Sequence, residues 1–305
     1  MHIAVTELDG QLKEQLIGNN AGTIVGELNR KYRRVINFVT TDQQSMISMA
    51  MDSIVPAPSM IKIADEDSFR RFWHRTIFAE KMIYLGRQQL RVSHFVLDFS
   101  QATVWSSQLG SAIPVYDQLK SQVETIDHFL MDYGNRQGIL AALYGLQQDR
   151  VDKLSIHQRY LAEQLNQLCV ERDTRVLKNF LGVGIGLTPS GDDFLTGFLA
   201  TWQYWQNHQL ELVDSKQDWL DLIKQHTTFV SGQMLKHCFF GRINTALKTV
   251  ITKGALVNKN DLQTLVAIGS SSGTDMLVGV LIGLQLIIKS KFQRGNKEDD
   301  VKGYR

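Results

Sequence analysis

Between Arg34 and about Trp105 the chain alternates between short apolar or β-branched runs and polar breaks. Apolar runs of about four to eight residues with this composition fit strands better than helices. Pro56 and Pro58 lie in the middle of this region and indicate a loop between strands. The expected strands lie at 35–41, 45–51, 59–63, 82–85, 92–99 and 102–105. We therefore predict a β-rich domain over 1–112, with one short helix near 66–76.

Beyond Pro114 the apolar positions recur at spacings of three and four, which is the period of a helix that faces a core. This pattern predicts helices at 115–131, 139–146, 156–170, 219–230 and 234–240. The most apolar run, 276–288, is shorter than the roughly 20 residues that a bilayer helix needs, so it predicts a buried core helix. We predict an α+β chain with a β-rich domain at 1–112, a helical domain at 113–288 and a charged, disordered tail at 289–305.

The composition favours a soluble globular protein. Of the 305 residues 43% are hydrophobic and 21% are charged, and the net charge of +2 gives no electrostatic reason to expect binding to nucleic acid or membrane. The first residues, with Glu7 and Asp9, lack the apolar stretch of a secretory signal. Two cysteines, Cys169 and Cys238, cannot build a disulfide framework and lack metal-ligand spacing. We therefore expect a cytoplasmic protein with two buried thiols.

One short motif occurs twice in the helical part. Six positions of the segment 190–199 recur in the segment 272–281 at a constant offset of 82 residues. They are Ser190, Gly191, Asp193, Leu195, Gly197 and Leu199, which recur as Ser272, Gly273, Asp275, Leu277, Gly279 and Leu281. A Val-Gly-Ile-Gly or Val-Ala-Ile-Gly run precedes each copy. Capping and helix packing explain either copy alone, but they do not explain why both features are duplicated, so we predict two pseudo-symmetric loop and helix repeats.

Each copy has the features of an anion-binding helix start. Glycines such as Gly184 and Gly186 permit a positive φ and let a ligand approach the backbone. Ser190 and Asp192 are good N-cap residues for a helix that begins near Asp193, whose free N–H groups would favour a phosphate or carboxylate. The spacing Gly-x-Gly-x-Gly differs from the dinucleotide fingerprint, so a Rossmann site is rejected.

The two copies are expected to form one composite site. Gly197 lies four residues after Asp193, and Gly279 lies four after Asp275, so each glycine shares a helix face with its aspartate. If these faces meet, the helices approach closely at the glycines and both Ser-Gly-x-Asp starts lie together around a pseudo-two-fold axis. The aspartates would repel a bare phosphate, which leaves two alternatives: a bridging Mg²⁺, or a ligand with N–H donors beside its anionic end.

The segment between the copies adds hydroxyl groups. On a helix, Thr227 and Ser231 share one face, and Thr228 and Ser231 are neighbours, so these hydroxyls could line the same pocket. Arg242 and Lys236 are candidate anion partners, although a solvated role is favoured for each. The eight histidines show no metal-ligand spacing, so we assign no metal ligands. The predicted catalytic residues are Asp192, Asp193 and Asp275, and the predicted substrate-binding residues are Gly186, Thr188, Ser190, Gly191, Thr228, Ser231, Ser271, Ser272 and Gly273.

The segment Gly186-Leu-Thr-Pro-Ser-Gly-Asp-Asp-Phe-Leu-Thr-Gly197 resembles a bacterial family that includes the AllH-type subunit of oxamate carbamoyltransferase. The resemblance extends more loosely to 227–231, to Gly241 and to 271–279, and so covers most of 180–285. Many relatives place a histidine before the second Ser-Gly, where this chain has Ser270. No role of that histidine carries over.

The resemblance implies a part in the breakdown of ureides such as allantoin, in which a multi-subunit enzyme converts oxalurate and phosphate to oxamate and carbamoyl phosphate. These compounds are small anions with amide N–H groups, as the site requires. The resemblance therefore indicates a carbamoyltransferase subunit that works with companion subunits, with the cofactor left open between none and Mg²⁺. Two alternatives remain: a non-catalytic assembly subunit, and a Mg²⁺-dependent enzyme that acts on a phosphorylated metabolite.

Overall fold

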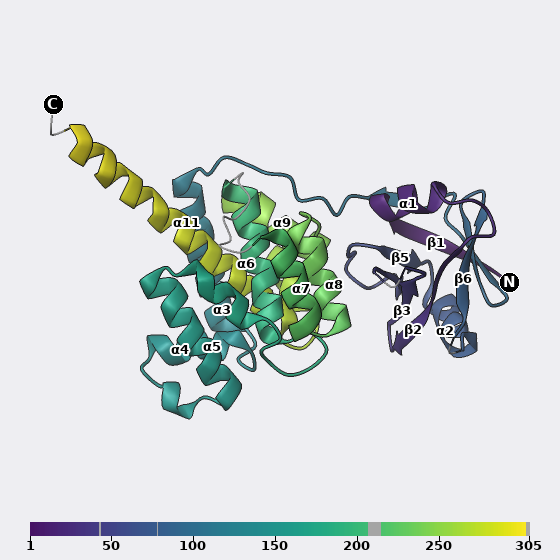
Figure 1. Cartoon of the computed structure of the whole chain (residues 1–305), viewed down its shortest axis with the longest axis horizontal. Coiled ribbons are helices and arrows are strands. Elements are labelled where there is room, and N and C mark those ends of the chain that lie inside the picture. The colour runs from purple at the N-terminus through teal and green to yellow at the C-terminus, as the bar shows by residue number, and fades with distance from the viewer. Residues whose placement is uncertain (43, 78, 207–214, 303–305) are drawn as a thin grey trace. The chain divides into compact units, whose positions relative to one another are not determined.

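The computed structural model describes residues 1–302 except 43, 78 and 207–214, and it describes side chains only as far as Ser290. The chain divides into two compact units, Met1–Gln108 and Leu109–Arg305. The first unit is built on a β-sheet and the second is mostly helical (Figure 1), so the prediction of a β-rich part followed by a helical part is confirmed. The division lies close to the predicted boundary after residue 112.

The first unit is a closed sheet. Its strands are β1 (His2–Asp9), β2 (Ile24–Tyr32), β3 (Val35–Thr40), β4 (Met46–Met51), β5 (Met60–Ile63), β6 (Lys81–Gly86), β7 (Gln89–Val92), β8 (Phe95–Asp98) and β9 (Thr103–Trp105). The order is β5-β4-β3-β2-β6-β7-β8-β1-β9, and β5 also pairs with β1. Because β5 bonds to both β4 and β1, eight strands close into a barrel, and β9 extends the sheet beside β1.

Helices α1 (Gly10–Ile17) and α2 (Glu66–Arg75) contribute apolar residues to the core of this unit. Helix α1 buries Leu12 and Leu16, and helix α2 buries Phe69 and Phe72. These pairs are three or four residues apart, which places each pair on one helix face. The ring of Phe72 packs edge-on against that of Phe95 at a centroid distance of 5.4 Å. The buried faces of these helices belong to the same hydrophobic core as strand residues such as Ile36, Phe38 and Leu97.

The strands predicted between 35 and 105 are present, with one correction. The predicted strand 92–99 is two strands, β7 and β8, which pair antiparallel in a hairpin. Ser93 has a φ of 55° in the turn between them, a conformation that a continuous strand does not adopt. Strands β1 and β2 and helix α1 precede the region in which we predicted structure.

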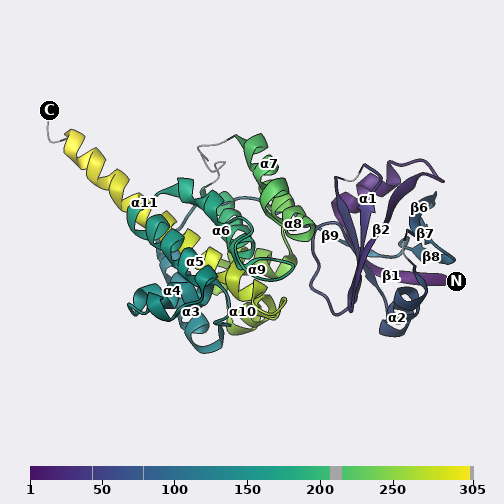
Figure 2. The same cartoon turned by 60° about the horizontal axis from the view of Figure 1, so that its bottom comes forward.

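The second unit consists of helices joined by short turns. They are α3 (Tyr116–Tyr133), α4 (Ile139–Gln147), α5 (Ile156–Asn166), α6 (Ser190–Gln206), α7 (Lys216–His226), α8 (Phe229–Phe239), α9 (Thr245–Lys253), α10 (Lys259–Val266) and α11 (Ser272–Lys302). The described residues of this unit also form three 3₁₀ turns (Val151–Lys153, Thr174–Phe180 and Gly254–Leu256) and a π-helical turn (Gln167–Glu171). Helices α6 and α11 pack side by side through its middle in both views (Figures 1 and 2).

The helices predicted at 115–131, 139–146 and 156–170 are present as α3, α4 and α5. The predicted boundary between the next two helices is wrong. The pattern over 219–230 predicts one helix, but α7 ends at His226 and α8 begins at Phe229. Between them Thr227 is extended, and the hydroxyl of Thr228 accepts a hydrogen bond from the Ser231 N–H at 3.2 Å. The Thr228 hydroxyl thus caps α8, and the extended backbone of Thr227 ends α7.

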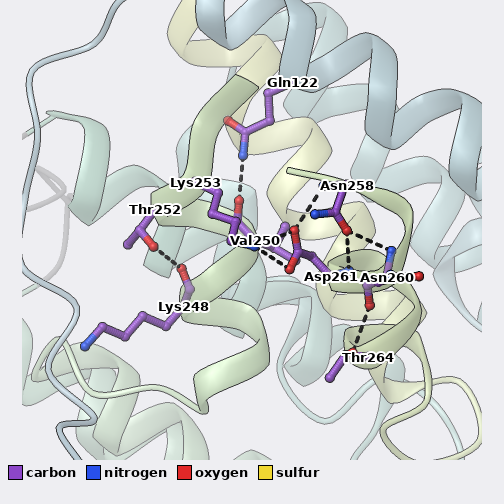
Figure 3. Close-up of polar contacts among 9 residues, drawn as sticks. All are labelled: Gln122, Lys248, Val250, Thr252, Lys253, Asn258, Asn260, Asp261 and Thr264. Carbon is purple, nitrogen blue, oxygen red and sulfur yellow. Dashed lines mark hydrogen bonds and ion pairs between the residues drawn. The ribbon is translucent and has the colours of Figure 1, made fainter. Parts of the chain in front are cut away.

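Helices α9 and α10 were not predicted, and local polar contacts explain their bounds (Figure 3). Asn258 caps α10 by accepting from the N–H groups of Asn260 and Asp261 at 3.0 and 3.2 Å. Lys253 at the end of α9 pairs with Asp261 at 2.7 Å, and Gln122 of α3 donates to a carbonyl of α9 at 2.8 Å. These contacts hold α9 and α10 beside α3.

Helix α11 forms the centre of the unit. Its segment Ser272–Ser290 is long and apolar enough to cross a membrane by length and composition, the one such helix among the described residues. About 78% of its most apolar stretch is buried inside the structure, as expected for the core helix that the sequence predicts. The helix continues to Lys302 and so includes much of the segment 289–305, in which the sequence predicts a disordered tail.

Candidate functional site

Helices α6 and α11 touch at their backbones. A Cβ atom on Gly197 would lie 1.9 Å from the carbonyl oxygen of Met276, and one on Gly279 would lie 2.2 Å from that of Phe194. Real Cβ atoms do not approach oxygen so closely, so any larger residue would push the helices apart. The two glycines therefore let the starts of α6 and α11 lie close together.

Helix α6 begins at Ser190, three residues before the predicted start near Asp193. The N–H of Gly191 donates to the Val183 carbonyl at 2.8 Å, and the N–H groups of Asp192 and Asp193 donate to the Pro189 carbonyl at 2.9 and 3.1 Å. Ser190 and Asp192 are therefore inside the first turn and are not its N-caps. Because three first-turn N–H groups are occupied, α6 offers fewer free donors to an anion than the sequence indicates.

Gly191 and Gly273 also face protein atoms. A Cβ on Gly191 would lie 2.0 Å from the Phe180 carbonyl oxygen, and one on Gly273 would lie 1.9 Å from that of Leu265. Each glycine permits the chain before its helix to pack against the first turn. Gly186, by contrast, is exposed and has a φ of 106°, and a Cβ at this position would meet no atom within 4 Å.

Asp192 ties the loop before α6 to helix α8. Its Oδ1 accepts from the Gly182 N–H at 2.8 Å, and its Oδ2 accepts from the hydroxyl of Ser231 at 2.7 Å and from that of Thr227. Burial raises the pKa of Asp192, and these hydrogen bonds oppose the rise. Since both oxygens are bonded within the chain, the contacts of Asp192 favour an anchoring role over ligand contact.

Asp275 is fully buried at the start of α11. Its Oδ1 accepts from the N–H of Ile139 at the start of α4, at 2.8 Å. Burial raises the pKa of Asp275 to about 6, and the Ile139 N–H and the hydroxyls of Ser190 and Ser271 oppose this rise by hydrogen bonding. Asp275 therefore keeps its proton to a higher pH than an exposed aspartate does.

Asp193 is the matching carboxyl of α6, with only 1% of its surface exposed. Burial raises its pKa well above the usual value, the hydroxyls of Ser272 and Thr188 oppose the rise, and the charges of Asp275 and Asp192 add to it. Within the described part of the chain, the Oδ2 atoms of both Asp193 and Asp275 are buried without a hydrogen-bond partner. Buried polar atoms are bonded in the great majority of cases, so unpartnered oxygens on two electrostatically coupled carboxyl groups indicate a ligand.

Hydroxyl groups surround this pair. The Thr188 and Ser272 hydroxyl oxygens lie 2.9 Å apart, which joins the loop of the first copy to the helix start of the second. The Thr228 hydroxyl donates to the Leu187 carbonyl at 2.6 Å and so fixes the far end of the same loop. The structure thus brings Thr188, Ser190, Asp193, Ser271, Ser272 and Asp275 together, while Thr228 and Ser231 act on the loop and on Asp192.

The loop between α3 and α4 belongs to the site and was not predicted. The side-chain amide of Asn135 donates to the Ser270 carbonyl at 2.8 Å, and its N–H donates to the Thr274 hydroxyl at 3.2 Å. A Cβ on Gly138 would lie 2.1 Å from Oδ1 of Asp275, so this glycine lies directly against the carboxyl group. The loop carries no charge pattern or motif, and its two glycines at 134 and 138 were the one available signal.

The other candidates lie in a separate cluster on and after α8. Arg242 is buried, with its Nη1 atom 3.3 Å from Nδ1 of His237. Burial, and then the charges of Arg242 and Lys236, lower the pKa of His237 to about 3, so the imidazole is neutral. No group of three or more His, Cys, Asp or Glu side chains suited to a metal ion occurs among the residues that the structure describes.

Residues 180–284 match the model of the family described as oxamate carbamoyltransferase subunit AllH. This match confirms the resemblance seen in the motif at 186–197, and its bounds contain both Ser-Gly-x-Asp starts. No solved structure matches the chain significantly.

Proposed function

We propose that the chain is a subunit of an oxamate carbamoyltransferase-like enzyme, and that the starts of α6 and α11 form one composite site for its ligand. The match to the AllH family supports a subunit of this kind. The single observation that carries the site is the pair of buried, unpartnered oxygens on Asp193 and Asp275. A role as a passive assembly surface does not account for them, because both carboxyl groups are inside the unit.

The contacts between the two copies support a pseudo-two-fold arrangement. Gly197 packs on Met276, and the equivalent residue Gly279 packs on Phe194, the equivalent of Met276. The same exchange relates the polar contacts, because the Ser272 hydroxyl bonds to Asp193 and the Ser190 hydroxyl bonds to Asp275. Each aspartate thus accepts a hydrogen bond from the serine of the other copy, which favours one site built from both copies over two separate sites.

The ligand that fits this site is a small anion that carries amide or carbamoyl N–H groups. Two carboxyl groups with raised pKa values repel an anion less than two permanently charged ones would. When ionised they accept hydrogen bonds from the N–H groups of such a ligand. Carbamoyl phosphate, oxamate and oxalurate all have this combination.

In the proposed reaction the site holds and orients the reactants of carbamoyl transfer, an effect of position and electrostatics that needs no covalent intermediate. Ionised Asp193 and Asp275 would fix the nitrogen end, and companion subunits would complete the site. Asp192 would keep the glycine-rich loop in place through Gly182. We place the enzyme in ureide catabolism in the cytoplasm, where its cysteine thiols stay reduced.

The test is isothermal titration of the chain, alone and with its companion subunits, against carbamoyl phosphate, oxamate and oxalurate. We expect binding of at least one of the three, and loss of binding in the double variant Asp193→Asn with Asp275→Asn. Absence of binding in both settings would refute the proposal. Lost assembly with unchanged ligand binding in the double variant would indicate the assembly role instead, and binding abolished by chelator would indicate the Mg²⁺-dependent alternative.

A further inference from the structure

Asp193 and Asp275 each keep one buried oxygen, Oδ2, without a hydrogen-bond partner in the described part of the chain. We propose that these two oxygens accept the two hydrogens of a single –NH₂ group, so that the site selects a primary carbamoyl or amide group and rejects its methyl isostere. This proposal rests on the function proposed above and specifies which end of the ligand the carboxyl pair holds.

The hydrogen-bonding capacity of the site matches one nitrogen. The carboxyl of Asp275 already bonds to the Ile139 N–H and to serine hydroxyls, and that of Asp193 bonds to the hydroxyls of Ser272 and Thr188. One acceptor atom therefore remains on each of two carboxyl groups from two different helices. A planar –NH₂ group presents two hydrogens that diverge from one atom, and so it suits two acceptors related by exchange of the copies.

Other ligand groups fit this pair less well. Once the pair is ionised, a phosphate or carboxylate oxygen would meet only acceptors and would be repelled. A methyl group offers no hydrogen-bond donor, so both oxygens would stay buried and unpaired. A divalent cation needs about six oxygens, yet the hydroxyls beside the pair act as donors to the carboxyl groups.

The loop before α6 ends beside the buried pair. It is fixed at Gly182 by Asp192 and at Leu187 by the Thr228 hydroxyl. Between these points Gly184 and Gly186 have φ values of 133° and 106°, and the intervening Ile185 is 84% exposed. Thr188, at the end of the loop, hydrogen-bonds toward Asp193.

Binding of –NH₂ requires ionised carboxylates, so it is coupled to proton release. Burial, and then the charges of Asp275 on α11 and of Asp192 on α6, raise the pKa of Asp193. The pKa of Asp275 itself is raised to about 6. A ligand that takes the ionised form lowers these pKa values and drives protons into solution. Affinity should therefore rise as pH increases through about 6, where Asp275 ionises, and should level off only when Asp193 is ionised as well.

The experiment compares two pairs of probes that differ only by NH₂ in place of CH₃: oxamate against pyruvate, and carbamoyl phosphate against acetyl phosphate. Titration calorimetry on the chain with its companion subunits should show at least about a tenfold preference for the NH₂ member of each pair, on the order of the cost of unpaired buried acceptors. Repetition in buffers of different ionisation enthalpy should show that protons are released when the NH₂ probes bind.

Matched variants assign the preference to the carboxyl pair. Asp193→Asn and Asp275→Asn should each bring the ratio of the two affinities, NH₂ probe to CH₃ probe, close to 1. Asp132→Asn, which changes an exposed aspartate of α3, should leave this ratio unchanged. The helical circular dichroism of each variant checks that the unit is folded. An unchanged preference in a folded variant at either position would overturn the proposal.

The remaining outcomes separate this proposal from the function on which it rests. Equal affinity for both members of each pair would overturn the selection of –NH₂ and leave the proposed function standing. Binding of Mg²⁺ alone, with a preference that chelator abolishes, would reassign the pair as a cation site and overturn the proposal. Failure of every probe to bind would refute both.

Discussion

Replacement of Asp275 by asparagine should remove the loss of folding stability that ionisation of this buried carboxyl group causes as pH rises. The carboxyl group is fully buried, and its pKa of about 6 exceeds the ordinary value of 3.8 by about two units. Such a difference corresponds to about 3 kcal/mol. Because the folded chain holds this proton more tightly than the unfolded chain, stability falls as pH rises from about 4 and the loss is complete above about 6.

The asparagine variant lacks this titration but keeps the contact to α4. Its amide oxygen can still accept from the Ile139 N–H, while its NH₂ group replaces the unpartnered Oδ2 and costs about 1–3 kcal/mol if it finds no acceptor. We therefore expect the variant to be less stable than the parent protein near pH 4 and as stable or more stable near about pH 8.

Urea unfolding followed by the helical circular dichroism signal measures this difference, because the helices lie mainly in the second unit. The stability of the variant relative to the parent should improve by about 3 kcal/mol between about pH 4 and about pH 8. A relative stability that does not change with pH would refute the assignment of a raised pKa to Asp275.

Three further predictions concern packing and polar contacts. Gly197→Ala and Gly279→Ala should each cost about 2–4 kcal/mol in urea unfolding, because the new methyl groups would collide with backbone oxygens, whereas Gly232→Ala should stay within about 1 kcal/mol; equal effects at all three positions would contradict the close helix contact. Ser231→Ala should cost about 1–3 kcal/mol and raise the pKa of its partner carboxyl further, as measured by unfolding at several pH values; no loss of stability would show that this hydroxyl does not matter. The thiol of Cys238, fully buried and with a pKa raised to about 12, should react with a thiol reagent only as fast as the unit opens, and rapid native-state labelling would be inconsistent with this burial.

Much of the candidate site was predictable because its residues lie in repeated local motifs. The duplicated Ser-Gly-x-Asp segment predicted the close approach of α6 and α11, and the glycines at 197 and 279 make that approach. Periodicity likewise located most helices of the second unit and most strands of the first. In both cases the evidence consists of residues that are near one another in the chain.

What the sequence could not predict depends on contacts between distant residues. Nothing local indicates that Asp275 accepts from the N–H of Ile139, or that Asn135 reaches Ser270. The break between α7 and α8 was missed because Thr227 and Thr228 fit a helical pattern, while the Thr228 hydroxyl caps α8 and the Thr227 hydroxyl bonds to the distant Asp192. The contacts of Asp192 depend on the loop geometry, which its motif does not specify.

The central claim is that the starts of α6 and α11 form a single binding site, and a double-mutant cycle tests it most directly. Oxamate affinity is measured by calorimetry for the parent protein, Asp193→Asn, Asp275→Asn and the double variant, each with companion subunits. We predict one ligand per chain and a coupling of about 1–3 kcal/mol between the two changes, because either one alone deprives the ligand of the pair. Two ligands per chain, or losses that simply add, would contradict a composite site.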